Sequence, residues 1–96
     1  MQEIGRKPLF PLGQVVATPG ALAALEKAGQ GAAPFLTRHA AGDWGDLCPE
    51  DVSENRLGLA CGFRFMSSYP TAAGEQVRIV TEADRSVTTI LLPEEY

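Results

Sequence analysis

Apolar residues recur with two different periods along the chain, and the period changes at Thr18. Before it, residues 9–17 hold a pair of β-branched residues behind Pro and Gly, which predicts a short strand entered through a turn. After it, apolar residues follow at helical spacing as far as Gly29. Because Thr18 is a good N-cap and Pro19 suits the first helical position, the sequence predicts a helix that begins at Pro19 and stops at Gly29.

A second helix is predicted over residues 49–61. Pro49 presets the backbone for a first helical turn, and Glu50 and Asp51 place negative charge at the positive end of the helix dipole. Gly62 is suited to end this helix. The stretch between the two helices is rich in Gly and Pro and lacks a sustained period, so only a helical turn over residues 35–39 and then a loop are expected there.

The last third of the chain is rich in strand-forming residues. Three runs of aromatic and β-branched side chains, at residues 63–69, 76–81 and 86–92, are separated by short turn-like connections and predict an antiparallel meander. Alternation along the runs predicts one face for the helices to cover: Phe63, Phe65, Val77, Ile79, Val87, Thr89 and Leu91. The predicted fold is therefore α+β, with an N-terminal strand that can join the sheet edge, two helices and a three-stranded C-terminal meander.

Length and composition favour one folded unit. The 96 residues, 45% of them hydrophobic and 21% charged, suit a single domain over residues 1–96. A net charge of -4 repels polyanions, so no direct contact with nucleic acid is expected. No stretch is apolar enough to span a membrane or to form a signal region. With Cys48 and Cys61 expected as reduced thiols, the sequence predicts a cytoplasmic protein.

Three blocks of sequence carry a resemblance. Residues 10–24 read FPLGQVVATPGALAA, residues 38–47 read RHAAGDWGDL, and residues 81–96 read TEADRSVTTILLPEEY. Together they resemble a family of small uncharacterised proteins encoded on bacterial plasmids, integrative elements and phages, over nearly the whole chain. The resemblance implies a bacterial, cytoplasmic protein in a mobile-element context, and it carries no activity over to any residue.

The loop over residues 42–46 is a candidate binding site, because it places the only Trp between two Gly and two Asp. Trp44 beside Asp43 and Asp46 would suit a recognition tip, since Trp is enriched at interface hot spots. In the alternative interpretation, Trp44 fills the edge of a small core and Asp46 helps to cap the following helix.

The second candidate is the predicted hairpin tip. Glu82, Asp84 and Arg85 gather two carboxylates and a guanidinium within a few residues, a set that could bind a charged partner or substrate. The alternative is a plain charged turn in which Asp84 accepts a hydrogen bond from the backbone of Ser86.

His39 raises two chemical hypotheses. With Asp43, Asp46 and Cys48 it offers legitimate metal ligands, but their spacing fits no established motif, so neither a metal nor another cofactor is expected. As the only side chain that titrates unaided near neutrality, His39 could also serve as a general base. No phosphate-binding loop or nucleophile elbow accompanies it, so no catalytic residue is assigned and an enzyme is not expected.

The function favoured by these observations is a small acidic protein-binding module. Its acidic clusters, at residues 43–54, at Glu82 and Asp84, and at Glu94 and Glu95, would dock on the basic surface of a host protein involved in defence or nucleic-acid handling. One alternative is a small hydrolase or transferase that uses His39 with nearby carboxylates, which predicts a pocket shared by His39, Trp44 and the hairpin tip. Another is a structural homodimer that buries an apolar outer face containing Met66, Val80 and Ile90.

Overall fold

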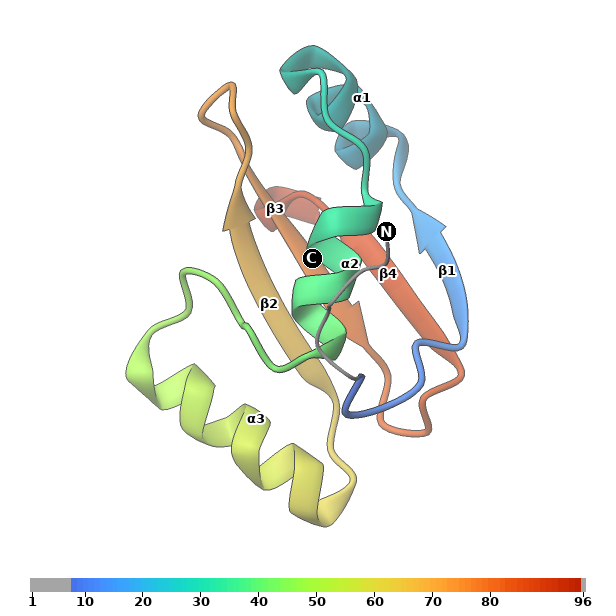
Figure 1. Ribbon diagram of the computed structural model, residues 1–96, viewed down its shortest axis with the longest axis vertical. Coiled ribbons are helices and arrows are strands. Elements are labelled where there is room, and N and C mark those ends of the chain that lie inside the picture. The colour runs from blue at the N-terminus through green and yellow to red at the C-terminus, as the bar shows by residue number, and fades with distance from the viewer. Residues whose placement is uncertain (1–7, 96) are drawn as a thin grey trace, which may run out of the picture.

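The computed structural model describes residues 8–95, which form a four-stranded sheet and three helices (Figure 1). α2 crosses one face of the sheet, α1 lies at one end of it, and α3 runs beside the edge strand β2. The α+β prediction is therefore confirmed. In chain order the elements are β1 Gln14–Ala17, α1 Pro19–Ala28, α2 Ala33–Ala40, α3 Pro49–Cys61, β2 Phe65–Pro70, β3 Gln76–Thr81, β4 Val87–Leu91 and a 3-10 turn at Pro93–Glu95.

Two helices begin and end where the capping residues predict. The Thr18 hydroxyl accepts a hydrogen bond from the Ala21 amide at 3.1 Å, and α1 stops at Gly29, which adopts a left-handed conformation. α3 ends in the same way at Gly62. The expectation of only a helical turn before it was wrong, because α2 is a complete helix of 8 residues whose buried side chains pack on the sheet.

The sheet has the order β1-β4-β3-β2. β2, β3 and β4 form the predicted antiparallel meander, and β1 joins the sheet in parallel beside β4. Two parallel strands cannot be joined by a tight turn and need a long connection. The three helices and the first two strands of the meander supply that connection between β1 and β4. β1 and β2 are therefore the two edge strands.

The predicted helix-facing side of the sheet was right for β2 and β3 and wrong for β4. Ile79 pairs with Ile90, and Thr81 pairs with Thr88, so Thr88 and Ile90 share the covered face in place of their neighbours. Phe63 precedes β2 and is exposed. The outer face expected for a homodimer was wrong in part, because Val80 and Ile90 lie on opposite faces of the sheet and both are buried, while Met66 is half-buried.

The core has two parts. The larger lies between α1, α2 and the sheet, and contains Ala21, Ala24, Leu25, Phe35, Tyr69, Val77, Ile79 and Ile90. The smaller is an aromatic cluster of Phe10, Trp44 and Phe65, whose ring centroids lie 4.3 to 6.4 Å apart. Phe10 precedes β1, so the aromatic cluster fastens the N-terminal segment to the sheet.

The outer edge of β2 is closed by other parts of the chain. The Asn55 side chain of α3 donates to the Met66 carbonyl at 2.8 Å and accepts from its amide at 3.2 Å, as a neighbouring strand would. Further along, the Ser68 amide donates to Trp44 and the Ser68 carbonyl accepts from Asp46. Gly45 lies so close to the Ser68 carbonyl, at φ 73°, that a side chain there would collide with it. These contacts leave β1 as the open edge of the described sheet.

Replacing Asn55 by Ala should destabilise the fold, because Asn55 is 4% exposed and both polar groups of Met66 would lose their partner. We expect the free energy of unfolding in urea to fall by about 1–3 kcal/mol. Ser53→Ala, at an exposed position of the same helix, serves as the control and should change it little. Equal stability of the two variants would show that the edge needs no cap.

Candidate functional site

The loop that contains Trp44 is folded inward. Trp44 is 8% exposed and stacks on Phe65 with ring centroids 5.5 Å apart, while its edge meets the His39 ring at 5.7 Å. The structure therefore places this side chain in the core, in agreement with the core-filling interpretation and not with the recognition tip.

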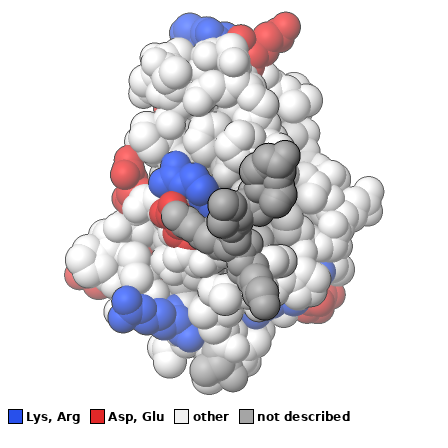
Figure 2. All heavy atoms as spheres, in the orientation of Figure 1, with Lys and Arg blue, Asp and Glu red and all other residues white. Residues whose placement is uncertain are grey.

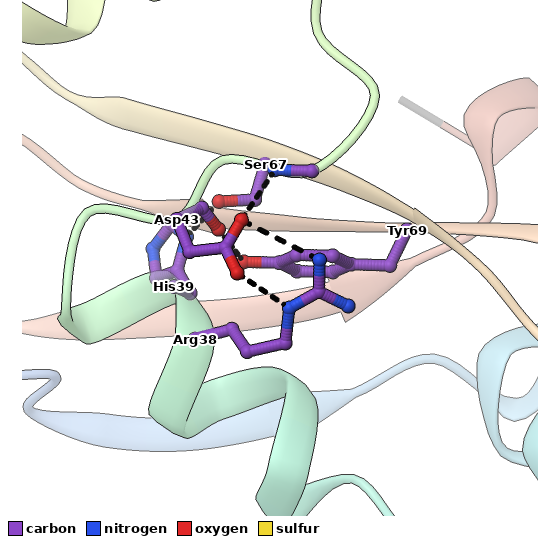
Figure 3. Close-up of polar contacts among 6 residues, drawn as sticks. Arg38, His39, Asp43, Ser67 and Tyr69 are labelled. Atoms are coloured by element: carbon purple, nitrogen blue, oxygen red, sulfur yellow. Dashed lines mark hydrogen bonds and ion pairs between the residues drawn. The ribbon is translucent and has the colours of Figure 1, made fainter. Parts of the chain in front are cut away.

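Asp43 is held by a neighbouring cation (Figure 3). Arg38 of α2 donates from Nε to its carboxylate at 2.8 Å, and the guanidinium carbon lies 4.5 Å from the centre of the Tyr69 ring. The Tyr69 hydroxyl donates to the Asp43 backbone carbonyl at 2.5 Å. Burial raises the pKa of Tyr69 to about 12, and the hydrogen bond to Asp43 raises the pKa of Arg38. The cluster of these three residues therefore anchors the loop to α2 and β2.

His39 lies beneath this cluster and is completely buried. Its Nδ1 is 2.5 Å from the Ser67 hydroxyl, and its Nε2 is 2.9 Å from the Thr81 hydroxyl. A chain of hydrogen bonds continues from the Thr81 hydroxyl to the Thr88 hydroxyl, whose oxygens lie 2.7 Å apart. Thr88 in turn donates to the Leu12 carbonyl at 2.7 Å. One imidazole thus connects α2 with three strands and with the segment before β1.

The proton positions in this chain of hydrogen bonds follow from its last acceptor, the Leu12 carbonyl. A carbonyl can only accept, so Thr88 donates to Leu12 and must accept from Thr81. Thr81 then accepts from Nε2–H of His39. The hydrogen bonds therefore fix one proton on Nε2, and because burial lowers the pKa of the imidazole from 6.5 to about 4, the ring is neutral at pH 7 and Nδ1 is bare. The bare Nδ1 accepts from the Ser67 hydroxyl.

The Ser67 and His39 pair has the reach of a nucleophile and its base, but it has no access to a substrate. Both side chains are fully buried, and each nitrogen of His39 is already bonded within the fold. The described residues therefore lack the pocket shared by His39, Trp44 and the hairpin tip that the enzyme hypothesis predicts. They also hold no group of three or more metal-ligating side chains.

The hairpin tip is a turn stabilised by its own side chains. One carboxylate oxygen of Asp84 accepts from the Ser86 amide at 3.0 Å and from the Ser86 hydroxyl at 2.6 Å. These bonds lower the pKa of Asp84. This is the charged turn of the alternative interpretation.

Arg85 points from the tip back onto the protein. Its guanidinium lies 4.1 Å from the centre of the Phe65 ring and donates to the Phe63 carbonyl at 2.7 Å. It also donates to the Gly58 carbonyl in the last turn of α3 at 3.2 Å, where a cation complements the helix dipole. Arg85 and Trp44 therefore contact the same aromatic ring, and both serve the fold.

Three of the six residues predicted for binding are exposed: Asp84, whose carboxylate is bonded to Ser86 within its own turn, and Asp46 and Glu82. Asp46 accepts from the Gln76 side chain at 3.3 Å. Glu82 lies at the hairpin tip. The carboxylates of Asp46 and Glu82 belong to different loops, and no hydrogen bond or ion pair joins them among the described residues.

The feature that sequence reasoning missed is an apolar groove of about 690 Å³ between α2 and the segment that enters β1. Its lining holds no charged or titratable side chain: Pro8, Phe10, Pro11, Leu12, Gly13, Val15, Ala33, Leu36, Thr37 and Ala40. One signal was available, because residues 8–25 contain no charged residue. The other wall depends on α2, which the sequence predicted only as a turn.

Comparison with protein-family models, with curated proteins and with solved structures found no match. Within residues 8–95, no helix is both long and apolar enough to cross a membrane.

The buried imidazole should make stability depend on pH. The unfolded chain protonates His39 near pH 6.5 and the folded chain only near pH 4, so stability is complete above pH 6.5 and falls as pH is lowered between these values. The expected loss is about 3 kcal/mol. His39→Gln should be less stable at neutral pH and should lack this dependence. Because the chain has a single His, the difference between the two unfolding free energies isolates the effect; a difference that stays constant from pH 7 to pH 4 would contradict it.

Proposed function

We propose that the protein is a non-enzymatic binding module that receives an apolar segment of a partner protein in the groove between α2 and the segment entering β1. The observation that supports this best is the chemistry of the groove. Its walls are aliphatic and aromatic, with the Thr37 hydroxyl as the one polar side chain of the lining. Binding an apolar segment to such a surface is favourable, because it removes apolar groups from water.

The distribution of reactive groups favours binding over catalysis. His39, the one side chain with a suitable unperturbed pKa, is sealed in the core, and Arg38 and Arg85 are both engaged within the fold. An enzyme places its acid, base and ion-pairing groups where a substrate can reach them. In this chain His39, Arg38 and Arg85 hold loops and helices together.

Charge favours a partner segment with basic residues on either side of its apolar part. The chain carries a net charge of -4, which attracts cations at long range. Exposed carboxylates at Asp46, Glu50 and Glu54 lie before and along the first turns of α3. On the face drawn in Figure 2, charged side chains are scattered and most of the described surface is uncharged. Apolar contact would thus supply affinity, and the acidic residues would supply steering.

The resemblance to proteins of mobile elements suggests where the partner is found. A chain carried between bacteria by a plasmid, integrative element or phage meets host proteins that defend the cell or handle nucleic acids. Such proteins commonly present basic surfaces. We therefore propose a host protein of this kind as the partner, and modulation or inhibition of it as the consequence.

A charge placed in the groove should abolish capture of the partner. Ala33 is exposed on α2 and lines the groove, so Ala33→Arg inserts a long cation without removing core packing. Ala23→Arg is the matched control, because Ala23 is also an exposed helical alanine and lies outside the groove. In a pulldown from bacterial lysate read by mass spectrometry, a partner should be held by the wild type and by Ala23→Arg but lost by Ala33→Arg.

Two other outcomes of this pulldown would count against the proposal. Capture that survives Ala33→Arg would place the binding surface outside the groove. If no protein is captured and a small apolar molecule instead copurifies with the wild type and is lost from Ala33→Arg, the groove binds ligands and not a protein segment.

Neutralising the acidic residues should weaken the salt-dependent part of binding. Glu50→Gln with Glu54→Gln removes two exposed carboxylates from α3, and Glu26→Gln removes a comparable one from α1. Measured by surface plasmon resonance with the captured partner, the double variant should associate several-fold more slowly at low salt, with little change in dissociation. Glu26→Gln should have a smaller effect. Equal effects would indicate that only net charge matters.

A further inference from the structure

We infer that the open edge of β1 is a self-association surface, on which β1 of a second copy pairs antiparallel to form one continuous eight-stranded sheet. This inference is independent of the proposed function, because it uses the backbone edge of the strand and not the groove. It differs from the homodimer expected from the sequence, which relied on Met66, Val80 and Ile90 of the sheet face.

The backbone of β1 offers hydrogen bonds on its outer side. The Gln14 amide donates to Ser86 and the Thr18 amide donates to Ile90, so alternate residues of β1 point toward β4. By the alternation of a strand, the amide and carbonyl groups of Val15 and Ala17 point away from the sheet. Within the described residues no strand lies beyond them, and Figure 1 shows β1 at the rim.

The edge of β1 has no charged side chain, no Pro and no covering element among the described residues, although at 4 residues the strand is short. Natural edges carry charged side chains, Pro or a covering element. β2 is covered by Asn55 and by the loop over residues 44–46, whereas β1 has the sequence QVVA, in which Val15 and Val16 are 42% and 40% exposed. β-branched residues without a charge are what an additional strand requires.

The strand is complementary to itself about a two-fold axis at Val16. In that register Val15 and Ala17 of each copy exchange hydrogen bonds with Ala17 and Val15 of the other, and Gln14 stands opposite Thr18. Val16 meets its symmetry mate as a non-hydrogen-bonded pair, in which side chains approach most closely. Every outward backbone group of the strand then has a partner.

The absence of charge along β1 leaves this edge open to a second copy of the chain. Two molecules with a net charge of -4 repel each other, so they associate most readily through a neutral surface. Residues 8–25 carry no charge, and they include the whole of β1. No like charges therefore face each other across the proposed pair of strands.

The first test is the molar mass in solution. By light scattering after gel filtration, the full chain of 10.2 kDa should show twice that mass, falling toward the monomer on dilution. Val16→Lys places like charges at the two-fold axis and should give a monomer at every concentration. Leu22→Lys is the matched control, because Leu22 is 54% exposed in the same neutral segment but lies on α1, and it should remain dimeric.

A cysteine pair tests the register. Cys48 and Cys61 are free thiols and are first replaced by Ser. In that background Val16→Cys should form an interchain disulfide under mild oxidation. Position 16 stands opposite position 16 of the second copy, and the Cα spacing of a non-hydrogen-bonded pair suits a disulfide. Gln14→Cys stands opposite Thr18 and should not. A monomeric wild type, or a dimer unaffected by Val16→Lys, would overturn the proposal, and preferential cross-linking through position 14 would overturn the register.

Discussion

His39 joins parts of this protein that are far apart in the sequence. Through four successive hydrogen bonds its imidazole links α2 to β2, β3, β4 and the Leu12 carbonyl before β1. A buried network of this kind has strict geometry, because each hydroxyl has one proton and each unsatisfied group would be costly. The position of α2 over the sheet, and with it one wall of the groove, depends on these bonds.

The small size of the chain explains why several of its polar side chains serve the fold. A chain of 96 residues has a small core, so long polar side chains are needed to fasten its periphery. Arg85 closes α3 against the hairpin, and Arg38 holds the Trp44 loop against Tyr69. Glu95 accepts from the Thr18 hydroxyl at 2.6 Å and so joins the C-terminal turn to the start of α1.

Residues that act on their immediate neighbours in the sequence predicted the helix ends and the strands. The caps at Thr18, Gly29 and Gly62 fixed both long helices, and β-branched runs located the meander. Tertiary contacts determined the rest. The face presented by β4 depends on its register with β3, which places Ile90 opposite Ile79, and a shift of one residue reverses every side chain. α2 has weak helical signals of its own, and the burial of its Phe35 and His39 stabilises it.

The candidate sites show the same division. Asp84 as a self-bonded turn residue was predictable, because the bond to Ser86 spans two residues. For Trp44 the sequence left a core position and a recognition tip both open, because the choice depends on Phe10 and Phe65, which are distant in sequence. The groove was hidden for the same reason, since its walls come from two separated segments.

The uncharged segment 8–25 unites the two surfaces proposed for this chain. Val15 turns its side chain into the groove, while its backbone amide and carbonyl face the open edge. In the proposed dimer the two-fold axis stands perpendicular to the sheet, so the helices and grooves of both copies lie on the same face. A partner with two apolar segments could then bind both grooves at once, and the second contact would be intramolecular. Pairing through β1 would in this way convert two weak apolar contacts into one strong interaction.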